Sequence, residues 1–231
     1  MPAPESPRIL AVRLSSIGDV ILITPLLRAL RARHPGAHLA VLTKRATAPL
    51  LQHDPRIDSV IVLEPGGSLA ALARRLRAER YTHVLDLHGS LRSRALRWLV
   101  PGRWRGYDKH AVARWGLIHL HRRWYRDQVA TAERYFEAAR DLDVRPDGGP
   151  PEVVVPPASA DAAGAWLAAR GIPGRFVALA PGAAHATKRW PAESWQDLAT
   201  RLSRRGLGVV TVGGPEDAPI GAAVAAAAGA A

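Results

Sequence analysis

The chain has 231 residues, 48% of them hydrophobic and 23% charged, which is typical of a globular protein with one large or two small domains. It contains no cysteine, which excludes disulfides and thiolate metal sites and suits a cytoplasmic protein. No apolar run approaches the ~20 residues of a membrane span, and the N-terminus does not read as a secretory signal. The net charge of +12 indicates a polyanionic partner: nucleic acid, an anionic membrane surface or phosphorylated ligands.

The first part of the chain alternates strand and helix patterns. Helical periodicity is seen at 20–33 and 68–79, and a further helix is expected at 131–143. Short aliphatic runs predict strands at 9–14, 38–43, 59–63 and 82–87. This alternation predicts right-handed βαβ units, and so a Rossmann-like α/β domain with a parallel sheet over residues 1–145.

Composition changes in VRPDGGPPEVVVPPASAD, which contains five prolines and two glycines. We therefore predict an interdomain linker at 146–158. Residues 159–231 then show a second α/β pattern, with helices at 160–170 and 192–205, strands at 176–180 and 208–212, and the start of an alanine-rich helix. Two strands make a small sheet with open edges, so this second domain is expected to be incomplete; the alternative is a small lobe on the first domain.

The loop SSIGD, residues 15–19, joins the first strand to the first helix. Gly18 is expected to make a sharp turn, and Asp19 falls in the first turn of the helix, where it would cap free N–H groups. Equally, Asp19 lies where open α/β sheets bind ligands, and a carboxylate there would suit a general base acting on an acceptor hydroxyl. The missing G-x-G-x-x-G pattern counts against a dinucleotide oxidoreductase.

Two loops of the second domain offer candidate donor-binding residues. Thr187 and Lys188, beside a helix N-terminus, supply a hydroxyl, an ammonium and free N–H groups suited to a diphosphate, although a solvated loop explains them equally well. Glu216 and Asp217 follow a Gly-Gly turn, where an acid can accept hydrogen bonds from ribose hydroxyls. A helix cap is the slightly better interpretation of Asp217.

Residues 90–126 hold nine arginines and one lysine against a single acid, with four tryptophans and two tyrosines. This block suits a solvated basic face, a surface for single-stranded nucleic acid, or a docking face for a phosphorylated lipid at the inner membrane. At its start, His88, Arg92 and Arg94 follow a predicted strand end. They are therefore expected to face the same crevice as Asp19.

Four stretches together resemble glycosyltransferase family 9, the ADP-heptose:lipopolysaccharide heptosyltransferases: ILAVRLSSIGDVILITPLLRALR, VLDLHGSLRS, PGAAHATKRWPAESWQDLATRL and VVTVGGPED. The resemblance implies a GT-B fold of two Rossmann-like domains and an inverting transfer of heptose from ADP-heptose to the lipopolysaccharide inner core. It implies no metal and no cofactor apart from the donor substrate. Asp19 matches the catalytic base, while Thr187, Lys188 and Glu216 match donor-binding positions.

On the acceptor side we assign Ser16, Gly18, His88, Arg92 and Arg94. The expected partners are a nucleotide sugar and an anionic lipopolysaccharide core. The protein is expected in the cytoplasm, in peripheral contact with the inner face of the inner membrane, without a nucleic-acid partner. The family's Asp-Thr/Ser-Gly-x-x-His donor loop is missing, so we expect a C-terminally truncated chain that binds donor poorly.

The alternative function is a non-catalytic basic protein that binds single-stranded nucleic acid through residues 90–126. That hypothesis predicts strongly salt-dependent binding to oligonucleotides.

Overall fold

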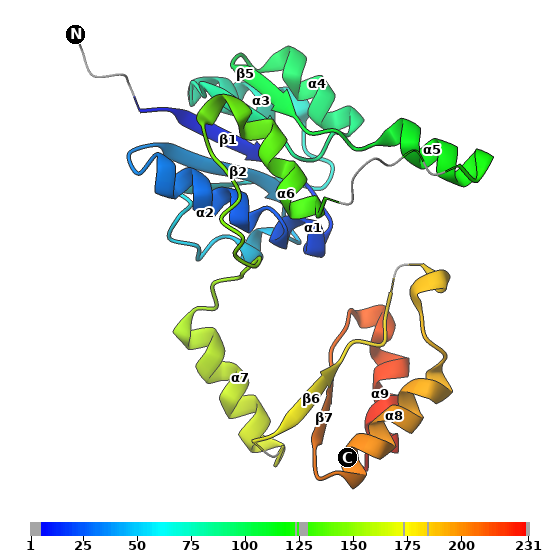
Figure 1. Cartoon of the computed structure of the whole chain (residues 1–231). Coiled ribbons are helices and arrows are strands. Elements are labelled where there is room, and N and C mark those ends of the chain that lie inside the picture. The colour runs from blue at the N-terminus through cyan, green and yellow to red at the C-terminus, as the bar shows by residue number, and fades with distance from the viewer. Residues whose placement is uncertain (1–5, 123, 125–128, 173, 184, 230–231) are drawn as a thin grey trace. The chain divides into compact units, whose positions relative to one another are not determined.

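The computed structural model describes residues 6–122, 124, 129–172, 174–183 and 185–229, so Arg123, Tyr125 and Arg126 of the basic block lie outside the described residues. The chain divides into two compact units, Met1–Val155 and Pro156–Ala231, each with a parallel sheet (Figure 1). This boundary falls inside the segment predicted as a linker. Within the described residues, no helix is long and apolar enough to cross a membrane.

The first unit is built on a five-stranded sheet whose neighbouring strands all run parallel, in the order β3-β2-β1-β4-β5. The central strand is fully buried from Ile9 to Val12, which explains its continuous aliphatic sequence. The strand order reverses between β1 and β4. The bounds are β1 (Arg8–Val12), β2 (His38–Lys44), β3 (Ser59–Leu63), β4 (His83–Asp86) and β5 (Arg103–Gly106).

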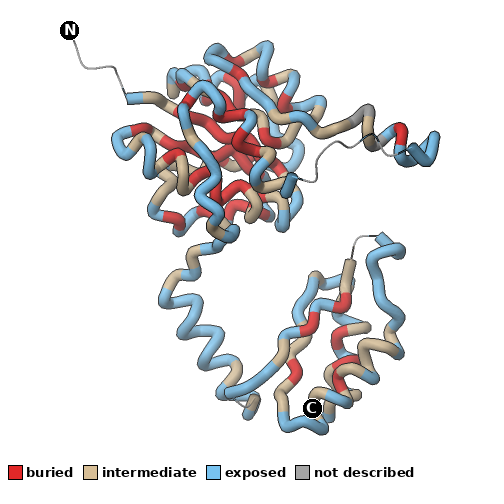
Figure 2. Tube along the Cα trace, in the orientation of Figure 1, coloured by how far each residue is buried: buried red, intermediate tan, exposed pale blue. Residues whose placement is uncertain are grey.

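Helices cover both faces of this sheet, and alternate residues of β1 enter two separate apolar cores. Ile9 and Ala11 pack with α2 and η2, whereas Leu10 and Val12 pack with α3 and α4. Figure 2 shows the buried residues gathered along the strands and the helix faces turned towards them. The helices are α1 (Ile17–Ile21), α2 (Thr24–Arg33), α3 (Leu69–Ala78), α4 (Leu91–Leu99), α5 (Ala111–Leu120) and α6 (Thr131–Arg134), with 3-10 turns η1 (Ala48–Leu50) and η2 (Tyr135–Leu142).

Two helix predictions are corrected. The helix predicted at 20–33 is interrupted after Ile21, because Pro25 lacks an N–H group and begins the second helix instead of continuing the first. The helix predicted at 131–143 is one α-helical turn followed by the 3-10 segment η2. Strand β5 was not predicted. Its sequence RWRG has none of the aliphatic character of a buried strand, because β5 lies at an edge of the sheet.

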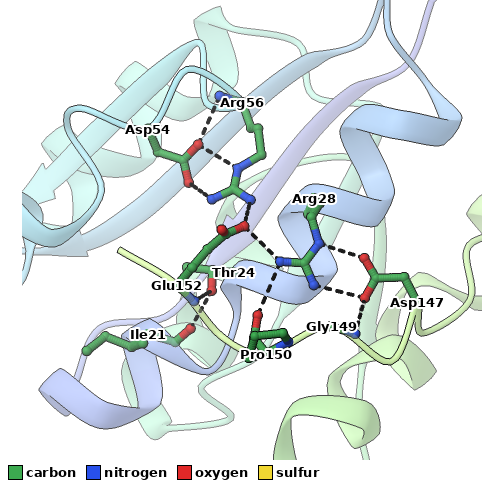
Figure 3. Close-up of polar contacts among 9 residues, drawn as sticks. All are labelled: Ile21, Thr24, Arg28, Asp54, Arg56, Asp147, Gly149, Pro150 and Glu152. Carbon is green, nitrogen blue, oxygen red and sulfur yellow. Dashed lines mark hydrogen bonds and ion pairs between the residues drawn. The ribbon is translucent and has the colours of Figure 1, made fainter. Parts of the chain in front are cut away.

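The segment that leaves the first unit is tied to it by a polar network, drawn in Figure 3. Arg28 on α2 forms two parallel hydrogen bonds with Asp147, of 2.6 and 2.9 Å, and a third of 2.8 Å with Glu152. Arg56 reaches the same Glu152 carboxylate, and the Glu152 N–H donates to Thr24 Oγ1 at 2.9 Å. Residues 147–152 are therefore fixed to the first unit, although their composition predicted a linker.

The second unit has two parallel strands, β6 (Phe176–Leu179) and β7 (Gly208–Thr211). Its small core contains Leu179, Val209 and Val224, and is closed by helices α8 and α9. The predicted strands and helices of this region are confirmed. The remaining elements are α7 (Pro157–Ala169), η3 (Ala186–Lys188), α8 (Ala192–Arg204), η4 (Pro215–Asp217) and α9 (Ala218–Ala227).

Candidate functional site

The candidate site lies at the carboxyl ends of β1 and β4 in the first unit, where the strand order reverses. Loops leaving such neighbouring strands diverge to opposite faces of the sheet and leave a ligand-binding crevice between them. Asp19 follows β1 and His88 follows β4. The structure thus brings both predicted residues to one edge of the sheet.

The Asp19 carboxylate is held through one of its oxygens. Oδ2 accepts hydrogen bonds from the Ser16 N–H at 3.1 Å and the Ser16 hydroxyl at 3.0 Å, and it lies 2.5 Å from the Arg13 guanidinium. Among the described residues, no donor is bonded to Oδ1, and the side chain is 35% exposed. One oxygen of the carboxylate is therefore anchored, whereas the other has no hydrogen-bond donor in the described part of the chain.

Arg13 fixes this arrangement, although it was not among the residues predicted from the sequence. Its side chain is only 8% exposed. The guanidinium donates to the carbonyl of Leu87 after β4, pairs with Asp19 after β1, and lies 5.6 Å from the ring centre of buried Tyr135. An arginine directly after a buried strand was the available signal, because such a charge needs a partner nearby.

The pKa of Asp19 reflects two opposing effects. Partial burial raises it, but the hydrogen bonds from Ser16 and the charge of Arg13 together hold the pKa of this carboxyl below its usual value. The group is therefore ionised at neutral pH. Asp19 also occupies the first turn of α1, so the predicted helix-end role and a role as base are compatible in one geometry.

The expected role of Gly18 in the turn is wrong. Gly18 is the second residue of α1, outside the positive-φ region, and the chain reaches α1 through the extended backbone of Ser16 instead. Apart from its chain neighbours and the helix backbone, a side-chain carbon added at Gly18 would meet no atom within 4 Å. The space beside this position of α1 is therefore open.

His88 lies in a tight turn after β4. The Asp86 carboxylate accepts from the N–H groups of His88 at 3.1 Å and Gly89 at 2.7 Å, and Lys109 donates to the carbonyls of the same turn. Burial, followed by the charges of Arg13 and Lys109, lowers the pKa of His88, so its ring is neutral at pH 7. The buried Nδ1 has no hydrogen-bond partner among the described residues.

Arg92 and Arg94 do not line the same cavity, although both belong to α4. Arg92 lines a pocket of about 370 Å³ at the carboxyl ends of β2 and β3, together with Lys44, Arg45 and Glu64. Arg94 lines a separate pocket with Arg97 and Trp98. Residues two apart on a helix point in different directions, which separates the two arginines.

In the second unit, the predicted donor-binding residues follow the carboxyl ends of its two strands. Thr187 and Lys188 are exposed in η3, after β6, and Glu216 is exposed in η4, after β7. Arg189, their neighbour, donates to the Ala183 carbonyl at 2.6 Å.

A pocket of about 200 Å³ opens at this same edge, and Asp217 lines it where Glu216 does not. Asp217 precedes α9, as predicted for a cap, but its carboxylate accepts from the N–H of Gly214 in the preceding turn at 3.0 Å. A side-chain carbon at Gly182 would lie 2.1 Å from that carboxylate. Glycine is therefore required at position 182 for Asp217 to occupy its place.

No group of three or more metal-ligating side chains is found in the part of the chain that the structure describes.

Comparison with known proteins extends this description. A model of glycosyltransferase family 9 (heptosyltransferase) matches residues 69–230, well over half of the chain. Among curated relatives, lipopolysaccharide heptosyltransferase 3 of Escherichia coli K12 is 24% identical over 86% of this chain and 60% of its own length. Lipopolysaccharide heptosyltransferase 2 of Salmonella typhimurium is 28% identical over 91% and 64%. The chain thus spans less than two thirds of the length of these relatives.

Solved structures agree with the fold. A family 9 glycosyltransferase from Veillonella parvula superposes with a TM-score of 0.77 at 25% identity, covering 95% of this chain and 66% of the other. ADP-heptose lipopolysaccharide heptosyltransferase II of E. coli gives 0.71 at 25% identity, covering 95% and 68%. These likenesses confirm the predicted GT-B type α/β fold. They give no support to the nucleic-acid-binding alternative.

The paired loop motifs, the two parallel sheets and the match over residues 69–230 lead to one assignment: this chain belongs to glycosyltransferase family 9.

Proposed function

We propose that this chain carries the acceptor side and part of the donor side of an inverting heptosyltransferase, which transfers heptose from ADP-heptose to the lipopolysaccharide inner core. The names of its curated relatives support this substrate class. The observation that carries the proposed chemistry is the Asp19 carboxylate, anchored through Oδ2 with Oδ1 left to accept a proton.

In the proposed reaction, Asp19 Oδ1 takes the proton of an acceptor hydroxyl. The hydroxyl oxygen forms a bond to the anomeric carbon of the heptose while the bond to the ADP oxygen breaks, so a single displacement inverts that carbon. A carboxylate with a lowered pKa is a weak base at neutral pH. It suffices because the hydroxyl becomes more acidic as the new bond forms, so the proton transfers late.

The acceptor's anionic groups would bind at the carboxyl edge of the same sheet. The pocket after β2 and β3 contains Lys44, Arg45 and Arg92, against Glu64 alone. Arg45 is already engaged by Glu64 through two hydrogen bonds of 2.6 and 2.7 Å, which leaves Lys44 and Arg92 to attract a phosphate or sugar carboxylate. His88, Ser16 and Gly18 border the Asp19 side of this edge.

On the donor side, Lys188 would contact the diphosphate with support from Thr187, and Glu216 would accept hydrogen bonds from ribose. An E. coli heptosyltransferase has been crystallised with ADP and with ADP-2-deoxy-2-fluoro heptose, which supports a nucleotide sugar as the class of donor. The proposed reaction uses no metal, no cofactor besides the donor and no nucleic-acid partner. We propose that it takes place in the cytoplasm.

The test separates catalysis from donor binding with two variants. Asp19→Ala is expected to lower heptose transfer to heptose-deficient lipopolysaccharide by about 100-fold or more, because the base is lost. Its affinity for ADP-heptose, measured by calorimetry, is expected to stay within about twofold. Lys188→Ala is expected to weaken ADP-heptose binding by about tenfold or more, since it removes a charge-assisted contact.

Trp166→Ala, an exposed position on α7, serves as the control for both measurements. Normal transfer by Asp19→Ala would remove the base assignment. Unchanged donor affinity in Lys188→Ala would remove the diphosphate assignment.

A further inference from the structure

We propose that an aromatic pair, Tyr135 and Tyr107, positions the base of the candidate site by holding the Arg13 guanidinium in place. The proposal rests on the proposed function, in which Asp19 is that base. Tyr135 is the first residue of η2, and Tyr107 follows β5 directly. Both lie outside the loops after β1 and β4 that carry the other residues of this site.

The Arg13 guanidinium is held both by polar partners and by an aromatic ring. Its terminal nitrogens contact the Leu87 carbonyl and Asp19 Oδ2. Its central carbon lies 5.6 Å from the centre of the Tyr135 ring, within the range of a cation–π contact. Such a contact is stronger when it is shielded from water, and the Arg13 side chain is only 8% exposed. The Tyr135 ring therefore contributes to fixing the guanidinium.

Tyr135 is suited to this role because packing fixes its own ring. Its side chain is fully buried in the apolar core that Ile9 and Ala11 of β1 enter. The Tyr135 hydroxyl has no hydrogen-bond partner among the described residues. What Tyr135 offers Arg13 is therefore the face of a rigid ring, which phenylalanine would also supply.

Tyr107 supports the Tyr135 ring from the end of β5. The two ring centres are 4.9 Å apart and the ring planes are perpendicular, which is the favourable edge-to-face geometry. The Arg134 guanidinium lies 5.6 Å from the Tyr107 ring centre and donates to the Asp108 carbonyl. The Asp108 N–H donates to Glu137 Oε2 at 2.8 Å. These contacts join the end of β5 to η2 and keep the two rings together.

The charges around Arg13 determine what its displacement would do. The titratable groups near Arg13 and Asp19 are His88 after β4 and the tyrosine pair. Burial lowers the pKa of His88 and raises the pKa of Tyr135, so both side chains are neutral at pH 7. Arg13 is thus the cation that holds Asp19 ionised, and a guanidinium released by the ring would hold it less strongly.

The test titrates the Asp19 carboxyl carbon by NMR in the 231-residue chain, with the resonance assigned by its loss in Asp19→Asn. In Tyr135→Leu the pKa of Asp19 is expected to rise from its value in the wild type, because Arg13 loses the ring that holds it. Tyr135→Phe keeps the ring and is expected to titrate like the wild type. Phe136→Leu is the matched control, since it truncates the neighbouring ring of the same core.

Two further variants complete the titration. Each measurement is repeated with His88→Gln, because the His88 ring gains a proton in acid and lies near Arg13. Tyr107→Leu, at a half-buried position, is expected to raise the pKa of Asp19 in the same direction by a smaller amount. Tyr107→Leu decides the question if Tyr135→Leu does not fold, and an unmoved pKa in it would then overturn the proposal.

Kinetics of heptose transfer give a second measurement. Tyr135→Leu is expected to lower kcat by about tenfold and to leave KM for ADP-heptose within about twofold, because the geometry of the base changes and the donor contacts do not. The acidic limb of the pH profile of kcat/KM is expected to move to higher pH, since a base works when ionised. Tyr135→Phe is expected to restore both.

An Asp19 pKa that does not move in Tyr135→Leu would overturn the proposal. An equal rise in Phe136→Leu would also overturn it, because general loosening of the core would then be the cause. So would a Tyr135→Phe variant that titrates like Tyr135→Leu, since the hydroxyl would then be responsible. The NMR titration contains no ADP-heptose or acceptor, so its outcome is separate from the test of Asp19 as the base by Asp19→Ala.

Discussion

Asp19 and Arg13 are six residues apart in sequence, and each depends on the other in the folded chain. Arg13 is nearly excluded from water, so its charge requires the Asp19 carboxylate and the Leu87 carbonyl. Asp19 in turn is oriented by Arg13 and Ser16, and its other oxygen has no hydrogen-bond donor among the residues that the structure describes. At the scale of residues, Arg13 is a positioning residue, while Asp19 would act on the substrate.

Arg13→Met tests this dependence through pH. Arg13 and the Ser16 hydrogen bonds lower the pKa of Asp19 against the effect of burial, so removal of Arg13 is expected to raise that pKa from its value in the wild type. A base works when ionised, so the acidic limb of the pH profile of kcat/KM is expected to move to higher pH. Stability is expected to fall by about 1–2 kcal/mol, less than for a fully buried pair because Asp19 is partly solvated.

Arg8→Met is the matched control, because Arg8 pairs with Glu79 at the opposite end of β1. It is expected to leave the pH profile in place. An unmoved acidic limb in Arg13→Met would show that Arg13 does not act through the pKa of Asp19.

Gly18→Ala tests whether the acceptor uses the open space beside Gly18. Gly18 has no strained backbone and an open surrounding, so alanine is expected to leave the free energy of unfolding unchanged or to raise it by up to about 1 kcal/mol. Heptose transfer is nevertheless expected to fall by about tenfold, because the added methyl would occupy the acceptor's space.

Gly164→Ala on α7 is the control for helix propensity, since it too meets no atom within 4 Å. Full transfer activity in Gly18→Ala would show that the acceptor approaches Asp19 from another side.

At the scale of elements, the periodicity of apolar residues predicted the positions of strands and helices better than it predicted their ends. The strands 38–43 and 59–63 are confirmed, because a buried strand requires an aliphatic run. The break between α1 and α2 is set by Pro25 inside an otherwise helical pattern. The attachment of residues 147–152 was not predicted, because proline and glycine content describes local backbone preference and not the distant Arg28 and Arg56.

Asp147→Asn tests that attachment. Hydrogen bonds from Arg28, followed by the Gly149 N–H, hold the pKa of Asp147 well below 3.8. Because the folded-state pKa is depressed, the stabilisation is complete above pH 3.8 and is lost as pH falls through the folded value. Both side chains are partly solvated, so the variant is expected to lose about 1 kcal/mol at pH 7 in urea unfolding.

The difference in the free energy of unfolding between wild type and Asp147→Asn is expected to become smaller as the pH falls from 4 to 2. Asp161→Asn, an exposed carboxylate on α7, is expected to show no such change. If the difference in the free energy of unfolding did not change with pH, the ionised Asp147 carboxylate would not be what holds residues 147–152 to the first unit.

At the scale of the whole molecule, the chain is two α/β units, and its excess of basic residues is concentrated outside their cores. Many arginines of the first unit form ion pairs with carboxylates of the same unit, such as Arg28 with Asp147. Arg92 instead lines the pocket after β2 and β3 together with Lys44. A pocket with two cations suits a small anion.

The sequence by itself determined the α/β class, the change of composition near residue 146, and the loops that carry Asp19 and Lys188, because each depends on local periodicity or on residues close in the chain. Only the tertiary structure decided the strand order β3-β2-β1-β4-β5. That order brings Leu87 into contact with Arg13, although the two are 74 residues apart in the sequence. It also decided that α5 extends from the core and that Asp217 lines a pocket that Glu216 does not. Periodicity records which face of an element is buried, whereas strand order and side-chain pairing depend on partners far away in sequence.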